Sequence, residues 1–140
     1  MITNRTFTMI KPEEVLNNNI GPIIDMIEKN GFEIINMKKH HLTQAQAEAF
    51  YGIHREKPFF QSLVAYMISG PVIAIILEKE NAVENYRAFI GSTDPSKAAE
   101  GTLRSIFGRS VQSNAVHGSD SDENAMLEGL FFFSKIEQIG

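Results

Sequence analysis

The sequence predicts an α+β fold built on one four-stranded sheet, and three observations support this prediction. Four short segments are rich in β-branched and aromatic residues, as strands are. Amphipathic segments with helical spacing separate them. The chain has 140 residues, 43% of them hydrophobic and 21% charged, which is enough for one sizeable core. No repeat or linker divides it, so we expect residues 1–140 to form a single domain.

The first part of the chain predicts a strand, a helix and a second strand. Residues 5–11 alternate in polarity and are rich in Thr, Phe and Ile, and Pro12 ends this strand. Gly21-Pro22 opens an amphipathic helix that ends at Gly31. Residues 32–42 form the second expected strand.

Two helices are expected next. Thr43 and Gln46 form a capping-box pattern at the start of a helix that runs to about Tyr51. A second helix begins at Pro58, because apolar residues then recur at helical spacing. These are Phe59, Phe60, Leu63, Val64 and Met67. Ser69-Gly70-Pro71 ends it.

The last part of the chain predicts two strands and two helices around a long loop. Residues 72–77 are uniformly apolar, which indicates an interior strand buried on both faces. Asn81 can cap the following helix, and residues 91–114 then lack sustained periodicity, as binding loops or unrecognised elements do. Asp120 and Glu123 suggest another cap for a helix to about Glu128, followed by a strand at residues 130–133. This order predicts a ferredoxin-like βαββαβ fold, a four-stranded antiparallel sheet covered by helices.

Composition and charge restrict the function classes. There is no cysteine, which excludes disulfides, thiolate nucleophiles and iron–sulfur clusters and favours a cytoplasmic protein. The longest apolar run has six residues, so no membrane span is expected. The net charge is −4, which argues against specific nucleic-acid binding. Residues 87–117 nevertheless carry +2 against −6 elsewhere, an imbalance that suits a small anionic ligand but also arises by chance.

The segment from Asn114 to Ser121, NAVHGSDS, is the most informative. His117 follows the irregular loop and precedes an expected helix N-terminus, where free N–H groups favour anions. The segment therefore presents a histidine to a phosphate-bearing ligand, or else contains an ordinary helix cap with an exposed histidine.

Further residues fit the same site. Lys11 ends the first strand with the same side-chain parity as Phe7 and Met9, and on an inward face an anion would have to pair with it. Arg87 and Arg104 flank the long loop, and arginine binds phosphate in bidentate fashion. Glu128 is eleven residues after His117, and a carboxylate bonded to one imidazole nitrogen makes the other the nucleophile. Taken singly, each of these charged residues can also be interpreted as an ordinary surface or strand-end residue.

Other residues give weaker signals. Either Phe59 or Phe60 could stack on a base, although both also suit the core. His40 and His41 should point to opposite faces of a strand and cannot share a metal, and His54 is expected at the surface. The phosphate-binding patterns GxxxxGK[ST] and GxGxxG are both absent.

Taken together, these segments resemble the nucleoside diphosphate kinase family along essentially the whole chain. The matching pieces keep the order and spacing of that family. They are TFTMIKPE at 6–13, YGIHREKPFF at 51–60, YMISGPVIAIILE at 66–78, GSTDPSKAAEGTLR at 91–104, NAVHGSDS at 114–121 and ENAMLEGLFFF at 123–133.

The resemblance implies a role for each matching residue. His117 would accept the γ-phosphoryl group of a nucleoside triphosphate and pass it to a nucleoside diphosphate, while Glu128 orients the histidine and Ser119 supports that carboxylate. Phe59 would stack on the base, with Leu63 and Val111 beside it. The residues implied to hold phosphates, the sugar 3′-hydroxyl or the surroundings of the histidine are Lys11, Tyr51, Arg87, Thr93, Arg104 and Asn114.

The resemblance also implies Mg²⁺ held mainly by the nucleotide's phosphates, nucleoside tri- and diphosphates as ligands, and self-association of dimers into a tetramer or hexamer. The nucleotide-binding loop would span about 91–114. A ferredoxin-like module that binds nucleotides without turning them over is the alternative.

Overall fold

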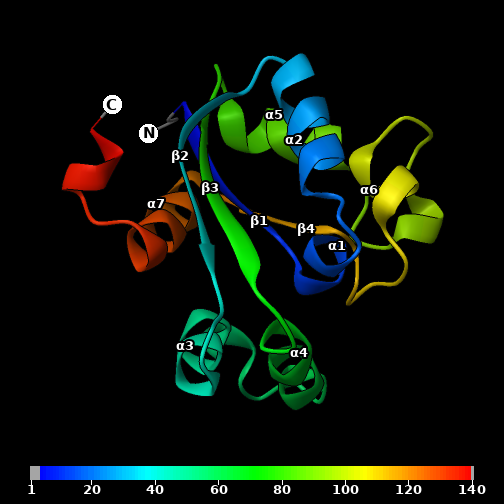
Figure 1. Cartoon of the computed structure of the whole chain (residues 1–140), viewed down its shortest axis with the longest axis vertical. Coiled ribbons are helices and arrows are strands. Elements are labelled where there is room, and N and C mark those ends of the chain that lie inside the picture. Colours follow the sequence, from blue (N-terminus) through cyan, green and yellow to red (C-terminus); the bar gives the residue numbers. More distant parts are fainter. Residues whose placement is uncertain (1–3, 140) are drawn as a thin grey trace.

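The computed structural model describes residues 4–139, which form an antiparallel sheet with helices around it (Figure 1). The sheet has the order β2-β3-β1-β4, and all its pairings are antiparallel. Its strands are β1 (Arg5–Ile10), β2 (Glu33–His40), β3 (Val72–Glu78) and β4 (Val116–Gly118). The predicted α+β, ferredoxin-like class with a four-stranded antiparallel sheet is confirmed.

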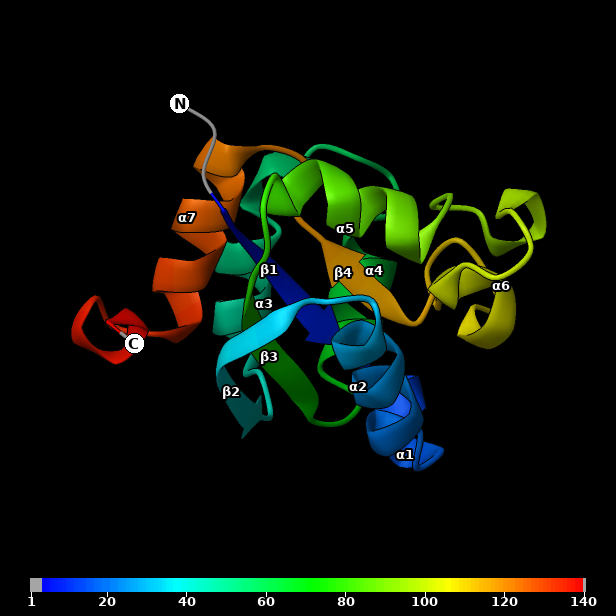
Figure 2. The same cartoon turned by 90° about the horizontal axis from the view of Figure 1, so that it is seen from above.

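The α-helices are α1 (Pro12–Leu16), α2 (Ile20–Lys29), α3 (Gln44–Phe50), α4 (Phe60–Met67), α5 (Ala82–Ile90), α6 (Leu103–Phe107) and α7 (Asp122–Phe132). Short 3-10 helices occur at η1 (Gly52–His54), η2 (Pro95–Lys97) and η3 (Ile136–Gln138). Figure 2 shows these helices surrounding the sheet from above.

The helices cover both faces of the sheet, as the interior strand β3 makes clear. Ala74 and Ile76 of β3 belong to a buried cluster with side chains of α3, α4 and α7. Ile73, Ile75 and Leu77 point the other way, into a cluster with α2 and α5. Alternate side chains of a strand face opposite sides, so the continuous apolar run predicted here reflects burial on both.

The predicted strand at residues 130–133 is wrong. Helix α7 continues through this run to Phe132, and the fourth strand is instead β4, which pairs with β1. Ala125, Gly129 and Phe132 recur at helical spacing and are the buried residues of α7. A short apolar run does not distinguish a strand from a buried helix, and β4 is too short to show a pattern.

Of the three N-caps expected from the sequence, the structure shows one as predicted and two that differ. The Thr43–Gln46 capping box is present at α3. At α5, Asn81 occupies the N-cap position with φ 50°, but its side chain donates to Glu84 and caps no backbone N–H. At α7 the cap is Ser121, whose Oγ accepts from Asn124 N at 3.0 Å, rather than Asp120.

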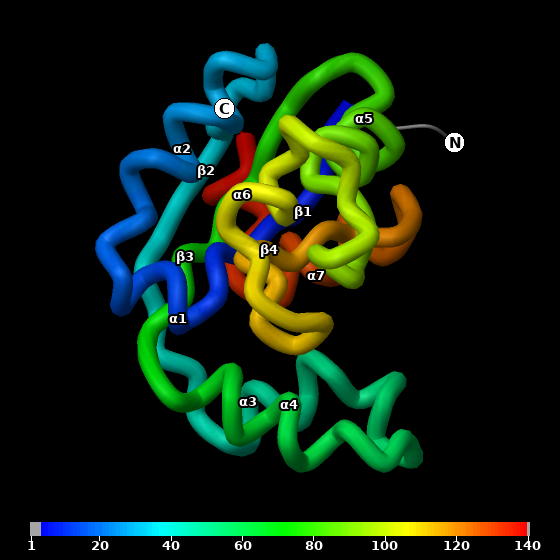
Figure 3. The backbone as a smooth tube through the Cα atoms, turned by 90° about the vertical axis from the view of Figure 1, so that its right-hand side faces the viewer, coloured from blue at the N-terminus to red at the C-terminus, as the bar shows by residue number. Residues whose placement is uncertain are grey.

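The loop expected at residues 91–114 contains one short α-helix, α6, and the 3-10 helix η2. Thr102 caps α6 by accepting from Ser105 N. Figure 3 shows α6 and its flanking connections at the surface, with the segment that follows approaching α4. A helix of five residues is too short to leave a periodic signal, which is why the sequence did not reveal it.

Candidate active site

A cavity of about 520 Å³ lies where η1, α4, the 91–114 segment and β4 meet. It brings together every residue predicted for the site except Glu128, which contacts His117, and Ser119, which contacts Glu128. The lining residues are Lys11, Tyr51, His54, Phe59, Leu63, Arg87, Thr93, Arg104, Val111, Gln112, Asn114, His117 and Gly118. The residues that resemble family positions therefore converge, although they come from distant parts of the chain.

His117 lies on β4, opposite Met9 of β1, and its ring is held on several sides. Its Nε2 is 2.8 Å from Glu128 Oε1, with both side chains about one-fifth exposed. The Ser119 hydroxyl donates to the same carboxylate oxygen at 2.5 Å. Phe50 meets the imidazole edge-on, with ring centroids 5.5 Å apart. Because Glu128 engages Nε2, Nδ1 remains the ring nitrogen available to a ligand.

Lys11 is one of two buried basic residues that line the cavity, with Arg104. Lys11 directly follows β1, and its Nζ donates to the Gln112 carbonyl at 3.2 Å. Burial, and to a lesser degree the nearby Arg104 charge, lowers the pKa of Lys11 to about 7. An anion in the cavity would favour the charged form of Lys11 and oppose both effects, so this lysine is placed to bind one.

Arg104 stabilises the walls of the cavity. Its Nε, Nη1 and Nη2 donate to the carbonyls of Asn114, Gly91 and Val116 at 3.2, 3.1 and 2.8 Å. Burial lowers its pKa to about 10, which leaves it charged at neutral pH. Arg104 thus joins the beginning of the 91–114 segment to β4, and it adds positive potential to the cavity beside Arg87.

Unpartnered buried polar atoms gather in this cavity. Among residues 4–139, four buried side-chain polar atoms have no hydrogen-bond partner, and three of them belong to lining residues: Tyr51 OH, His54 Nδ1 and Asn114 Oδ1. Burial raises the pKa of Tyr51, so its phenol stays protonated and can donate. Buried polar groups are normally paired, so such a concentration of free ones indicates a ligand site.

His54 is a residue that the sequence reasoning missed. It was expected at the surface but is half-buried and lines the cavity, beside Phe59 at a ring distance of 5.4 Å. The signal in the sequence is the position of His54 three residues after Tyr51, which also lines the cavity. His40 and His41 have separate partners, Gln46 and the Ile68 carbonyl, and do not form a joint site.

One side of the cavity is apolar. Phe59 sits at the N-cap of α4 and is nearly half exposed, whereas Phe60 is buried in the core. This answers which of the two phenylalanines is available for stacking. Leu63, one turn along α4, and Val111, which is more than half exposed, complete the apolar side.

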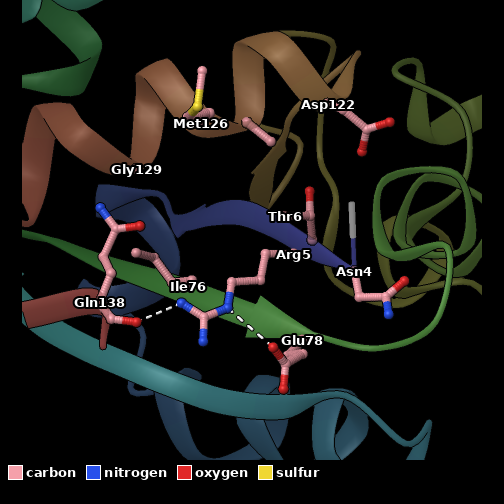
Figure 4. Close-up of a pocket in the computed structure, with 10 residues that line it drawn as sticks. Asn4, Arg5, Thr6, Ile76, Glu78, Asp122, Met126, Gly129 and Gln138 are labelled. Atoms are coloured by element: carbon pink, nitrogen blue, oxygen red, sulfur yellow. Dashed lines mark hydrogen bonds and ion pairs between the residues drawn. The ribbon is translucent and has the colours of Figure 1, made fainter. Parts of the chain in front are cut away.

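A second cleft, of about 330 Å³, lies between α7 and the strands β1 and β3 (Figure 4). Its arginine is already paired, since Arg5 Nε lies 3.0 Å from Glu78 Oε1 and Nη1 donates to the Gln138 carbonyl. None of the predicted site residues lines this cleft.

The described part of the chain contains neither a metal-binding cluster of side chains nor a membrane-spanning helix. Within residues 4–139, no group of three or more His, Cys, Asp or Glu side chains could hold a metal ion. Over the same residues, no helix combines the length and the apolar character needed to cross a membrane.

An oriented histidine beside a basic cavity with unpartnered polar atoms suits a phosphate-bearing ligand, and comparisons with known proteins make this more specific. The family model described as nucleoside diphosphate kinase matches residues 4–138. The nucleoside diphosphate kinase of Flavobacterium psychrophilum is 56% identical over 138 residues, covering 99% of both sequences.

Solved structures give the same result. The nucleoside diphosphate kinase of Aquifex aeolicus superposes with a TM-score of 0.92 at 41% identity, covering 96% of this chain and 98% of that one. The enzyme from Encephalitozoon cuniculi gives a TM-score of 0.93 at 34% identity, covering 98% and 93%.

The chain belongs to the nucleoside diphosphate kinase family. It is a phosphotransferase with nucleoside diphosphate kinase activity, and nucleotides are its substrates. This favours the enzyme over the non-catalytic nucleotide-binding module.

Proposed function

We propose that the enzyme transfers the γ-phosphoryl group in two half-reactions through a phosphohistidine at His117. The observation that carries this proposal is the His117–Glu128 pair, which engages Nε2 and leaves Nδ1 as the free ring nitrogen of a histidine that lines the basic cavity. A covalent intermediate divides the transfer into two similar steps and needs only one nucleotide site.

The first half-reaction forms one bond and breaks another. The Nδ1 lone pair attacks the γ-phosphorus of a nucleoside triphosphate, and the bond from phosphorus to the β–γ bridging oxygen breaks. The nucleoside diphosphate leaves with that oxygen. A second diphosphate then attacks phosphohistidine by the reverse path. During attack the imidazole gains positive charge, which the Glu128 carboxylate 2.8 Å from Nε2 stabilises. Ser119 holds that carboxylate oxygen.

Positive charge and polar donors bind the phosphates and sugar. Catalysis of phosphoryl transfer depends mainly on positioning and charge neutralisation. Lys11 and Arg87 bind phosphate oxygens, and Arg104 adds charge while it fixes the cavity walls. Tyr51, Thr93 and Asn114 supply polar contacts to the phosphates, the 3′-hydroxyl or the surroundings of the histidine. The free Tyr51 OH and Asn114 Oδ1 support such contacts.

The base stacks on Phe59 between Leu63 and Val111. Every base presents a π-face, so a site that relies on stacking discriminates weakly among bases. We therefore expect the enzyme to accept different bases, and both ribose and deoxyribose.

Mg²⁺ accompanies the nucleotide. Lys11, Arg87 and Arg104 line the cavity beside the expected phosphates, and Mg²⁺ would be held mainly by the nucleotide's phosphate oxygens. When bound, Mg²⁺ neutralises developing phosphate charge.

The active unit is a single domain over residues 1–140, with its nucleotide-binding loop at about 91–114, in a cytoplasmic protein. It assembles as a tetramer or hexamer built from dimers. The position of β2 at the edge of the sheet supports pairing between two copies. Sedimentation velocity separates these assemblies by mass, and a monomer would contradict the proposal.

Steady-state kinetics test the two-step transfer. Initial rates with ATP as donor, measured at several fixed acceptor concentrations, should give parallel double-reciprocal lines. Diphosphates with adenine, guanine, cytosine and uracil, and one deoxyribose acceptor, should all be phosphorylated. Intersecting lines would contradict the phosphohistidine route, and activity with a single base would contradict the stacking account.

A further inference from the structure

The turn at residues 109–113 connects α6 to β4 and is closed by its own hydrogen bonds. Arg109 N donates to the Ser113 carbonyl at 2.8 Å, and Ser113 N donates to Ser110 Oγ at 2.9 Å. Val111 and Gln112 lie within this turn, and both line the nucleotide cavity. The position of the turn therefore sets the shape of that wall.

Both ends of the turn are attached to α1 by carboxylates. At the first end, Arg109 Nε lies 3.3 Å from Glu13 Oε1 and 3.4 Å from Glu14 Oε2. At the other end, the Ser113 hydroxyl donates to Glu13 Oε2, and Tyr66 OH is 3.0 Å from Ser113 Oγ. The turn is thus held at a fixed distance from the helix that follows Lys11.

Glu14 makes this attachment unusual because its side chain is fully buried. Its Oε1 accepts from Asn19 Nδ2 at 2.7 Å, and its Oε2 faces Arg109. A buried carboxylate is costly unless a cation and hydrogen bonds compensate it. The Arg109 guanidinium is the cation that contacts Glu14, so moving the turn away would leave the carboxylate poorly compensated.

Two further contacts transmit the position of the turn to the cavity. Ser62 Oγ of α4 donates to Gln112 Oε1 at 3.0 Å, which joins the turn to the helix that carries Leu63. The Gln112 carbonyl accepts from Lys11 Nζ at 3.2 Å. The His117–Glu128 pair makes none of these contacts, since Glu128 lies on α7.

We propose that Arg109, held between Glu13 and Glu14, is a positioning residue that fixes the 109–113 turn and thereby the base-side wall of the nucleotide cavity. This proposal rests on the proposed nucleotide site. It assigns Arg109 no contact with the reacting atoms. Loss of the pair should therefore weaken nucleotide binding without slowing phosphoryl transfer from bound nucleotide.

The test compares Arg109→Gln, Arg109→Lys, Glu14→Gln and the double variant Arg109→Gln/Glu14→Gln with the wild type. Lys29→Gln is the matched control, because it removes an exposed ion pair with Asp25 that lies outside the cavity lining. Each protein is assayed for kcat and KM, and for inhibition by inorganic tripolyphosphate, a probe without base or sugar. Thermal midpoints monitor folding.

Arg109→Gln should raise the nucleotide KM about fivefold, the size expected for a partly exposed ion pair with one buried partner, with kcat within about twofold. Arg109→Lys should recover most of this loss. The double variant should be no worse than Arg109→Gln, because both changes remove one interaction. Inhibition by tripolyphosphate should change less than the nucleotide KM, by no more than about twofold, because this probe has no base and meets the turn only through the Gln112 carbonyl contact with Lys11.

Unchanged KM in well-folded Arg109→Gln would overturn the proposal. So would a fall in kcat, or an equal loss of tripolyphosphate inhibition, because each would locate the effect at the reacting phosphate. An absence of nucleotide saturation in the wild type would instead overturn the proposed nucleotide site, which keeps the two failures distinct.

Discussion

Replacing Glu128 with glutamine keeps the size of the side chain but removes the negative charge that faces His117. In the wild type, Glu128 Oε1 lies 2.8 Å from His117 Nε2 and accepts from Ser119 Oγ. The amide can still accept one hydrogen bond, so the ring should keep its approximate orientation. The change therefore isolates the electrostatic contribution of the carboxylate.

The size of the effect follows from this geometry. A hydrogen bond to a charged group contributes about 1.5–3 kcal/mol, compared with about 1 kcal/mol for a neutral one. The pair is about one-fifth exposed, so solvent screens it only in part. Positive charge on the imidazole grows during attack on phosphorus, and the loss should appear in kcat. The difference of about 0.5–2 kcal/mol corresponds to a fall in kcat of about twofold to about 30-fold, with KM nearly unchanged.

The assay is steady-state transfer from ATP to a nucleoside diphosphate, with Glu123→Gln as the control. Glu123 is an exposed carboxylate in the first turn of the same helix, and its replacement should leave kcat unchanged. A kcat of Glu128→Gln within twofold of the wild type would refute the electrostatic reasoning. A loss confined to KM would refute it as well.

Three other changes test different parts of the structure. Phe59→Ala should raise KM about tenfold for every base while kcat stays constant, because stacking contributes about 1–3 kcal/mol; a loss confined to one base in acceptor assays would contradict stacking. Burial, with the Arg104 charge second, lowers the pKa of Lys11 to about 7, from 10.5 in the unfolded chain. Between these two pKa values the nucleotide-free folded protein binds fewer protons than the unfolded chain, so its unfolding free energy should rise with pH. Urea unfolding at several pH values should show this rise relative to Lys11→Met, and parallel pH profiles of the two proteins would contradict the lowered pKa. Ile75→Ala should reduce the unfolding free energy by about 3 kcal/mol, because Ile75 is fully buried in β3; a urea-measured loss below about 1 kcal/mol would contradict that packing.

The elements that the sequence predicted are those whose signal is local. The strands β1 to β3 and the helices α2 to α5 each carry a pattern or cap within their own residues. β4 has only three residues, and its pairing with distant β1 makes it a strand. Residues 130–133 show the reverse error, because an apolar run alone does not separate a strand from the end of a buried helix.

The candidate site likewise contains residues that the sequence identified and contacts that it did not. The motif around His117 and the resemblance identified residues that the structure brings into one cavity or, for Glu128 and Ser119, against the histidine. Contacts that depend on packing were not visible in the sequence. Three examples are the placement of His54 in the cavity wall, the carbonyl contacts of Arg104, and the pairing of Arg109 with buried Glu14.

Mass spectrometry of the phosphorylated protein tests the central mechanistic proposal most directly. Wild-type protein incubated with ATP and without acceptor should gain one acid-labile phosphoryl group at His117, and a nucleoside diphosphate should remove it. His117→Ala should gain none while it still binds nucleotide. An unmodified wild type, or a phosphoryl group that persists in His117→Ala, would contradict the phosphohistidine mechanism.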